Sequence, residues 1–232
     1  GLPSYSAFQN APCGAGIVDY VTAYRLSGAA PKASEYIYPC DVGNGKIWLK
    51  PAGDHTQPGY TEALNSIDWQ DLYDHQDGYL MFEDLKQQWA QFEGKGFDYV
   101  LIDSRTGHTD AGGICTRQLP DAVVIMFVPN EQNIAGLVPI VNGIKAEKYR
   151  RKPIALEFCP SNVPDLDDEK EILSRLLADA KEKLGYKREP AAILHHYASL
   201  DILTQSAFVQ SRPNSKLAKE YERLRASIIA LN

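Results

Sequence analysis

Residues 97–107, with the sequence FDYVLIDSRTG, contain the pattern that decides the predicted fold. Residues 99–102 form a short apolar run of strand-forming residues, and an acid, Asp103, follows it directly. This pattern is typical of a buried parallel strand whose carboxyl end carries a functional side chain. Asp103 also has a purely structural interpretation, as a turn or helix-capping residue. The sequence on the C-terminal side favours the functional interpretation.

Alternating strand and helix patterns follow this segment. Residues 122–128 form a longer apolar run, which ends at Pro129 and Asn130, and an apolar helical stripe occupies residues 134–144. Residues 153–159 and 191–194 are also predicted strands, and helical patterns separate them. This alternation, which starts at residue 47, predicts an α/β fold: a doubly wound, mostly parallel sheet with helices on both faces.

The two segments FDYVLIDSRTG and LPDAVVIMFVPNEQNIAGL, residues 97–107 and 119–137, resemble the Walker B strand and the following strand of ParA/MinD-type ATPases. These ATPases belong to the deviant Walker A class of P-loop proteins. Gly1 and Leu2 resemble the end of the acidic segment that follows the second strand in one bacterial branch of that family. The resemblance implies one P-loop ATPase-like domain over residues 1–232, with its N-terminal strand, phosphate loop, first helix and second strand located before Gly1.

A phosphate-binding loop is the feature of that family that this sequence lacks. The motif G-x-x-x-x-G-K-[ST] and its deviant form bind phosphates through backbone N–H groups and a lysine. Residues 14–17, 43–47 and 94–97 are partial matches without the required spacing or the final Ser/Thr. The catalytic lysine and the water-positioning acid are therefore not assigned. We expect this chain to bind ATP weakly, and to be well folded only together with the upstream strands.

The resemblance implies catalytic roles for three residues of the first segment. Asp103 would hold Mg²⁺ through water, because this hard cation prefers oxygen ligands and keeps several waters. Thr106 and Gly107 would lie on the γ-phosphate side, where a hydroxyl group and a permissive backbone approach an anion closely. The glycine-containing loop that follows, residues 108–113, is either a γ-phosphate-sensing switch or a surface connection.

The predicted cofactor-binding residues follow later strands. Asn162 would face adenine in this family, and its amide group can both donate and accept hydrogen bonds. Its position between two prolines also fits an ordinary turn. Pro129 and Asn130 complete this set. His195 and His196 are adjacent at the end of the last predicted strand, where their side chains point to opposite faces, so we predict no metal site there.

The function implied by the resemblance is an ATP-binding and ATP-hydrolysing molecular switch that uses Mg²⁺. ATP would close a homodimer, and hydrolysis would release the dimer and a protein effector. The main alternative is an interaction module that keeps the fold without hydrolysing nucleotide. A bacterial tyrosine kinase is disfavoured, because no tyrosine cluster follows Tyr221. A flavodoxin-like domain is disfavoured because no Ser/Thr-rich phosphate loop follows a first strand.

The composition is compatible with these predictions. A chain of 232 residues with 44% hydrophobic residues suits one large α/β domain. The net charge of −6 and the absence of a basic block give no support for nucleic-acid binding. No apolar run approaches the roughly 18 residues of a membrane span. The four irregularly spaced cysteines favour reduced thiols in a cytoplasmic protein.

Overall fold

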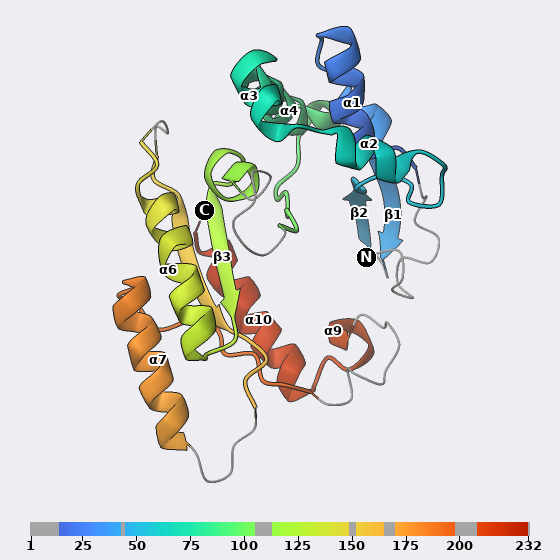
Figure 1. The fold of residues 1–232 in the computed structure, drawn as a ribbon. Coiled ribbons are helices and arrows are strands. Elements are labelled where there is room, and N and C mark those ends of the chain that lie inside the picture. The colour runs from blue at the N-terminus through green and yellow to red at the C-terminus, as the bar shows by residue number, and fades with distance from the viewer. Residues whose placement is uncertain are drawn as a thin grey trace. The chain divides into compact units, whose positions relative to one another are not determined.

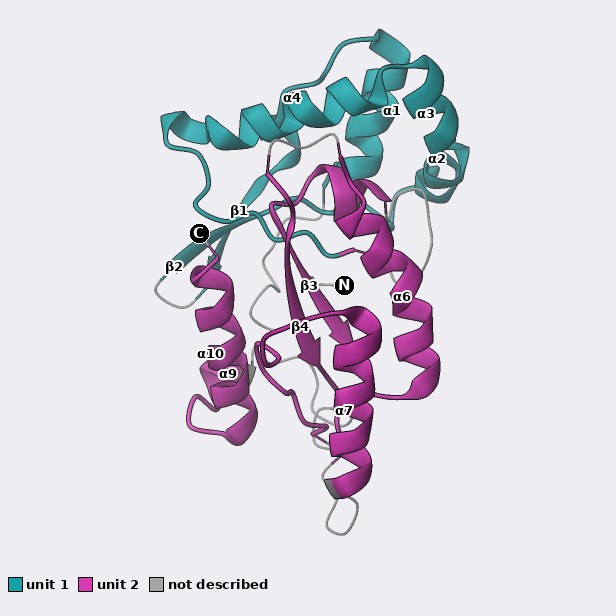
Figure 2. Cartoon of the chain, turned by 90° about the vertical axis from the view of Figure 1, so that its left-hand side faces the viewer, with its two compact units in different colours: residues 1–103 teal, residues 104–232 magenta. Residues whose placement is uncertain are grey.

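The computed structural model describes residues 14–42, 45–104, 113–148, 152–164, 170–197 and 208–231 (Figure 1). The chain divides into two compact units, Gly1–Asp103 and Ser104–Asn232 (Figure 2). Helices and strands occur together, which confirms the mixed α/β composition. The described strands form two two-stranded sheets, one antiparallel and one parallel. The larger doubly wound sheet therefore stays a prediction. None of the helices in the described ranges is long and apolar enough to cross a membrane.

The first unit is mainly helical. Many of its buried side chains lie on helices, including Tyr20, Val21, Leu72, Met81 and Leu85. A hairpin of two antiparallel strands connects these parts of the unit. The elements in chain order are α1 (Ile17–Ser27), η3 (Ala33–Tyr36), β1 (Tyr38–Val42), β2 (Gly45–Leu49), α2 (Tyr60–Ser66), α3 (Trp69–His75), α4 (Gly78–Ala90) and η4 (Phe92–Gly94).

Residues 97–104 form an irregular segment, so the predicted strand at residues 99–102 is wrong. Tyr99, Val100 and Leu101 are 48%, 43% and 86% exposed. An apolar run forms a strand when neighbouring strands pair with its backbone and cover its side chains. No described strand pairs with this run. Asp103 consequently lies in an irregular segment, with an exposed side chain, rather than at the end of a strand.

The second unit contains the parallel sheet. Strands β3 and β4 pair in register from Ala122–Ala155 to Phe127–Pro160, which confirms the two strands predicted there. Residues 191–196 lie along the other edge of β4, because Ala191 N and Leu194 N donate to carbonyl groups of that strand. The elements are η5 (Ile114–Gln118), β3 (Ala122–Phe127), α6 (Glu131–Lys145), β4 (Ala155–Pro160), α7 (Lys170–Leu184), α9 (Phe208–Ser211) and α10 (Lys216–Ile229).

Helices cover both faces of the parallel strands. Ile125 and Phe127 point to one face, where they pack with buried residues of α6 and α7 such as Ile134. Val124 and Cys159 point to the opposite face, against α10. The alternation of side chains along a strand produces these two layers. Figures 1 and 2 show α10 on the side of the strands away from α6 and α7.

Candidate functional site

The carboxyl ends of the parallel strands meet at one edge of the second unit. Ser161 N, just after β4, donates to Phe127 O at the end of β3, at 2.8 Å. On the other side of β4, Val163 and His195 form a parallel bridge. Ligands of parallel α/β sheets bind at such edges. We call this region the strand-end edge and define it by residues 128–130, 161–164 and 195–197.

The end of β3 leads directly into helix α6. Asn130 is the N-cap of that helix, since its Oδ1 accepts hydrogen bonds from Asn133 N at 2.8 Å and from Asn133 Nδ2 at 2.9 Å. This geometry explains why the chain turns into a helix at Glu131. Asn130 is exposed, whereas Pro129 is buried and fills a packing position. The edge therefore includes the positive end of the α6 dipole.

Asn162 lies at the carboxyl end of β4. Its backbone is in the left-handed region, with φ of 54°, and its side chain is exposed. Its Oδ1 is 2.7 Å from His196 Nδ1. An amide oxygen only accepts hydrogen bonds, so the imidazole nitrogen is the donor. This contact orients the amide and leaves its Nδ2 group as the hydrogen-bond donor of the side chain.

A buried acid fixes the neighbouring histidine. Glu220 of α10 is only 4% exposed, and it accepts hydrogen bonds from His195 N at 3.0 Å and from His195 Nδ1 at 2.7 Å. The two contacts hold His195 at the edge against the C-terminal helix. Sequence reasoning missed this pair. Its signal is the spacing Leu217–Glu220–Leu224, which places a charged residue on the apolar stripe of the helix.

Cys159 of β4 lies near this pair, on the face of the parallel sheet that α10 covers. Burial and the neighbouring Glu220 carboxylate raise the pKa of the Cys159 thiol to about 11. The thiol is fully buried and stays protonated at neutral pH. Because the thiolate is the reactive form, Cys159 is a packing residue and not a nucleophile.

The predicted catalytic residues are not part of the strand-end edge as described. Thr106 and Gly107 lie outside the described residues. Asp103 belongs to the first unit, whereas the edge belongs to the second, so their association stays a prediction. In the part of the chain that the structure describes, no group of three or more His, Cys, Asp or Glu side chains is arranged as metal ligands.

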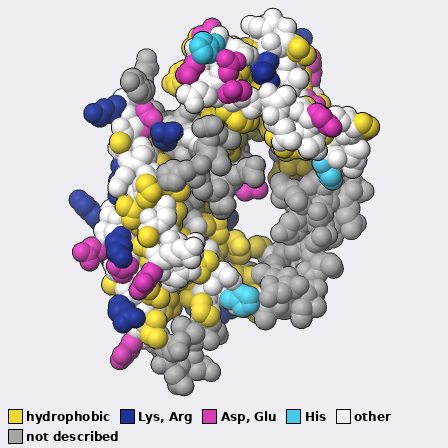
Figure 3. Space-filling model, viewed as in Figure 1, with side chains coloured by type: hydrophobic (Ala, Val, Ile, Leu, Met, Phe, Trp, Pro, Cys, Tyr) yellow, Lys and Arg dark blue, Asp and Glu magenta, His cyan; other side chains and the backbone are white. Residues whose placement is uncertain are grey.

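The surface charge is mixed on the face seen in Figure 3. Basic and acidic side chains are interspersed there, notably over α6 and α7. A pair of this kind is Lys183 and Asp179 in α7, whose Nζ and Oδ2 atoms lie 2.9 Å apart. The described residues of this face therefore form no continuous basic surface.

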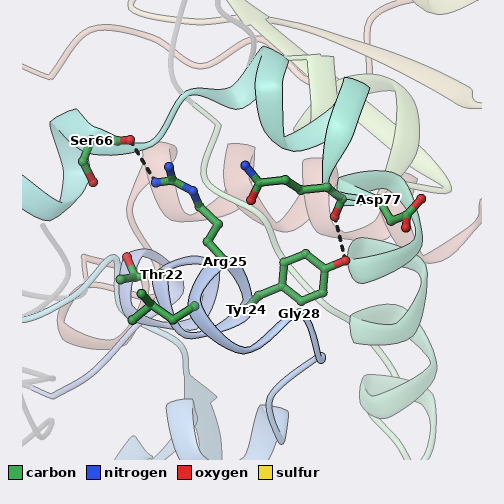
Figure 4. A pocket seen from close by; sticks show the side chains of 8 residues that line it. Thr22, Tyr24, Arg25, Gly28, Ser66 and Asp77 are labelled. Carbon is green, nitrogen blue, oxygen red and sulfur yellow. Dashed lines mark hydrogen bonds between the residues drawn. The ribbon is translucent and has the colours of Figure 1, made fainter.

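A cavity of about 550 Å³ lies in the first unit, beside α1 (Figure 4). Arg25 Nη1 donates to Ser66 O at 2.9 Å, and Tyr24 Oη donates to Gln76 O at 2.7 Å. These contacts use polar groups of the cavity to connect α1 with the ends of α2 and α3. The cavity therefore lies where these helices are joined by hydrogen bonds. Its lining residues are Thr22, Tyr24, Arg25, Leu26, Gly28, Ser66, Gln76 and Asp77.

Comparison with known proteins gives no assignment: no family model and no curated protein matches the chain.

Proposed function

We propose that the protein is an ATP-dependent molecular switch of the ParA/MinD type, and that the strand-end edge binds its adenine base. One observation carries the proposal: Asn162, held by His196, lies just past the carboxyl end of β4, and the paired strand β3 leads into the N-terminus of α6. The residues predicted to bind the cofactor follow neighbouring strands, at the edge where α/β sheets bind nucleotides.

The groups at the edge fit the base better than the phosphates. The amide of Asn162 supplies a donor for a ring nitrogen of adenine, and the exposed imidazole of His196 offers a planar surface beside it. The adjacent end of α6 contributes a partial positive charge but no cradle of N–H groups and lysine. The edge thus accounts for base recognition, and phosphate binding needs other residues.

The remaining roles follow the sequence motifs. Asp103 would hold Mg²⁺ through water, and the resemblance assigns Thr106 and Gly107 to the γ-phosphate side. Bound Mg²⁺ neutralises charge that develops on the phosphates during transfer. ATP closes a homodimer, and its hydrolysis releases the dimer and its protein effector.

A nucleoside titration followed by ¹H–¹⁵N NMR tests base recognition. We expect millimolar adenosine to shift the amide signals of residues 161–163 and 195–197, because it presents the base without needing a phosphate loop. Guanosine is expected to cause smaller shifts, since its ring edge reverses donor and acceptor positions. Asn162→Ala should remove most of the adenosine response.

Asn142→Ala is the matched control, because Asn142 is an exposed asparagine within α6, away from the strand ends. This variant should respond to adenosine like the parent. Unchanged signals at the edge with both adenosine and ATP would exclude it as a base site. That result would favour the alternative function, an interaction module without nucleotide.

A further inference from the structure

Lys50, immediately after β2, has its amine between two tyrosine rings. Lys50 Nζ is 4.5 Å from the ring centroid of Tyr20 and 4.9 Å from that of Tyr36. The two rings pack edge to face, with their centroids 5.4 Å apart. Neither Lys50 Nζ nor Tyr20 Oη has a hydrogen-bond partner among the described residues, and both atoms are buried. A lysine amine in this position is unusual, because ammonium groups are rarely buried without partners.

The charged groups around Lys50 offset only part of the free-energy cost of burying its charged amine. Asp19 on α1 attracts a proton to Lys50, but its carboxylate already accepts a hydrogen bond from Gly16 N at 2.7 Å. Asp84 on α4 acts on the neighbouring Tyr20 hydroxyl. The ring faces favour a cation, though by less than full hydration does. Burial dominates and lowers the pKa of Lys50 from its usual value of 10.5 to about 7, although Asp19 opposes this change.

The two residues that follow Lys50 hold the beginning of helix α1. Pro51 O accepts a hydrogen bond from Ile17 N, and Ala52 O accepts one from Val18 N, both at 2.9 Å. Gly16 packs so closely here that a Cβ atom would lie 2.2 Å from Pro51 O. A movement of Lys50 toward water would therefore disturb the first hydrogen bonds of α1.

We propose that Lys50, Tyr20 and Tyr36 form a proton-responsive lock at the start of α1. The lock is closed around a neutral amine. Protonation favours an open form in which the amine has moved toward water, and this movement releases the contacts of residues 51 and 52 with α1. The lock lies wholly within the first unit and is independent of nucleotide binding at the strand-end edge.

The direction of the pH effect follows from the depressed pKa. Between about pH 7 and pH 10.5 the open form binds a proton that the closed form does not. The closed form is therefore favoured as pH rises through this window, and the opening equilibrium constant falls about tenfold per pH unit. Below about pH 7 both forms carry the proton, so Lys50 adds no further pH dependence there.

NMR titration of the chain with ¹³C-labelled lysine tests the lock directly. We expect the Lys50 Cε signal to titrate with a midpoint near pH 7. The amide signals of Ile17 and Val18 should shift with the same midpoint, because their acceptors follow Lys50 in the chain. A Lys50 midpoint near 10.5 would overturn the proposal. A midpoint near 7 without any response at Ile17 and Val18 would also overturn it, because protonation of the amine would then leave the start of α1 unchanged.

Denaturant unfolding of Lys50→Met provides a second measurement. We compare the unfolding equilibrium constants of the parent and the variant as a ratio, parent over variant. This ratio should decrease as pH rises from 7 to 9.5, by up to tenfold per pH unit. Lys32→Met is the control, because Lys32 is exposed in the same unit, and its ratio should not change with pH. Parallel pH curves for the parent and Lys50→Met would contradict the lock. If Lys50→Met does not fold, the titration of the parent decides alone.

Discussion

Replacing Asp103 by alanine is expected to reduce Mg²⁺-dependent ATP hydrolysis by the protein by at least about 100-fold. The carboxylate is proposed to hold Mg²⁺ through water, and the metal stabilises charge on the transferred phosphoryl group. A loss of this size corresponds to roughly 3 kcal/mol of activation free energy. The side chain is exposed, so stability should change by no more than about 0.5 kcal/mol. Steady-state phosphate release and thermal unfolding measure the two quantities.

Asp98→Ala is the matched control for this experiment. Asp98 is an exposed aspartate in the same irregular segment, five positions earlier in the sequence. Its variant should hydrolyse ATP at nearly the parental rate, because it has no proposed role with the metal. Parental activity in Asp103→Ala would show that the Walker B assignment is wrong. Equal losses in both variants would indicate a general effect of charge in this segment.

The strands of the second unit were predictable from the sequence because their signals are long and clearly bounded. Residues 122–128 are a continuous apolar run, residues 153–159 are apolar except for Glu157, prolines bound both, and each contains a parallel strand. Residues 99–102 have the same local character and form no strand. The difference lies in the neighbours, since a strand needs a paired backbone and covered faces, which a local pattern does not report.

In the first unit, by contrast, a strand forms where the sequence did not predict one. Strand β1 was not predicted, because Tyr38–Val42 contains Pro39 and Asp41, both poor strand formers. Its antiparallel pairing with β2 overrides that weak propensity. The burial of Lys50 was also missed, because a lysine before a proline is typical of an exposed turn. Only the packing of α1 and η3 shows that its amine is enclosed by aromatic rings.

The strand-end edge was predictable where a residue follows a strand directly. Asn130 and Asn162 come within three residues of apolar runs, and the structure places both just past the carboxyl ends of paired strands. The partners of the edge were not predictable in this way. Glu220 lies 25 positions after His195, so its contact depends on how α10 packs against the sheet. Local patterns identify elements and their ends, but not which side chains meet across them.

His195→Ala is expected to destabilise the protein by about 3 kcal/mol, because it leaves the buried Glu220 carboxylate with one hydrogen bond, from the backbone of residue 195. Glu220→Leu should cost less than this, since it removes the buried charge itself and extends the apolar stripe of α10. The double variant His195→Ala/Glu220→Leu should then be more stable than the sum of the two single effects predicts, by about 1–3 kcal/mol. Urea unfolding at neutral pH gives all the free energies that this cycle needs.

Glu222→Ala is the control on the same helix. Glu222 accepts a hydrogen bond from Arg225 Nε at 2.9 Å, and both side chains are exposed. Solvent and salt screen such a pair, so its loss should leave stability nearly unchanged. Additive effects of His195→Ala and Glu220→Leu would mean that the two side chains do not stabilise each other. A strong coupling, with a weak effect at Glu222, would show that this buried pair fastens α10 to the strand-end edge.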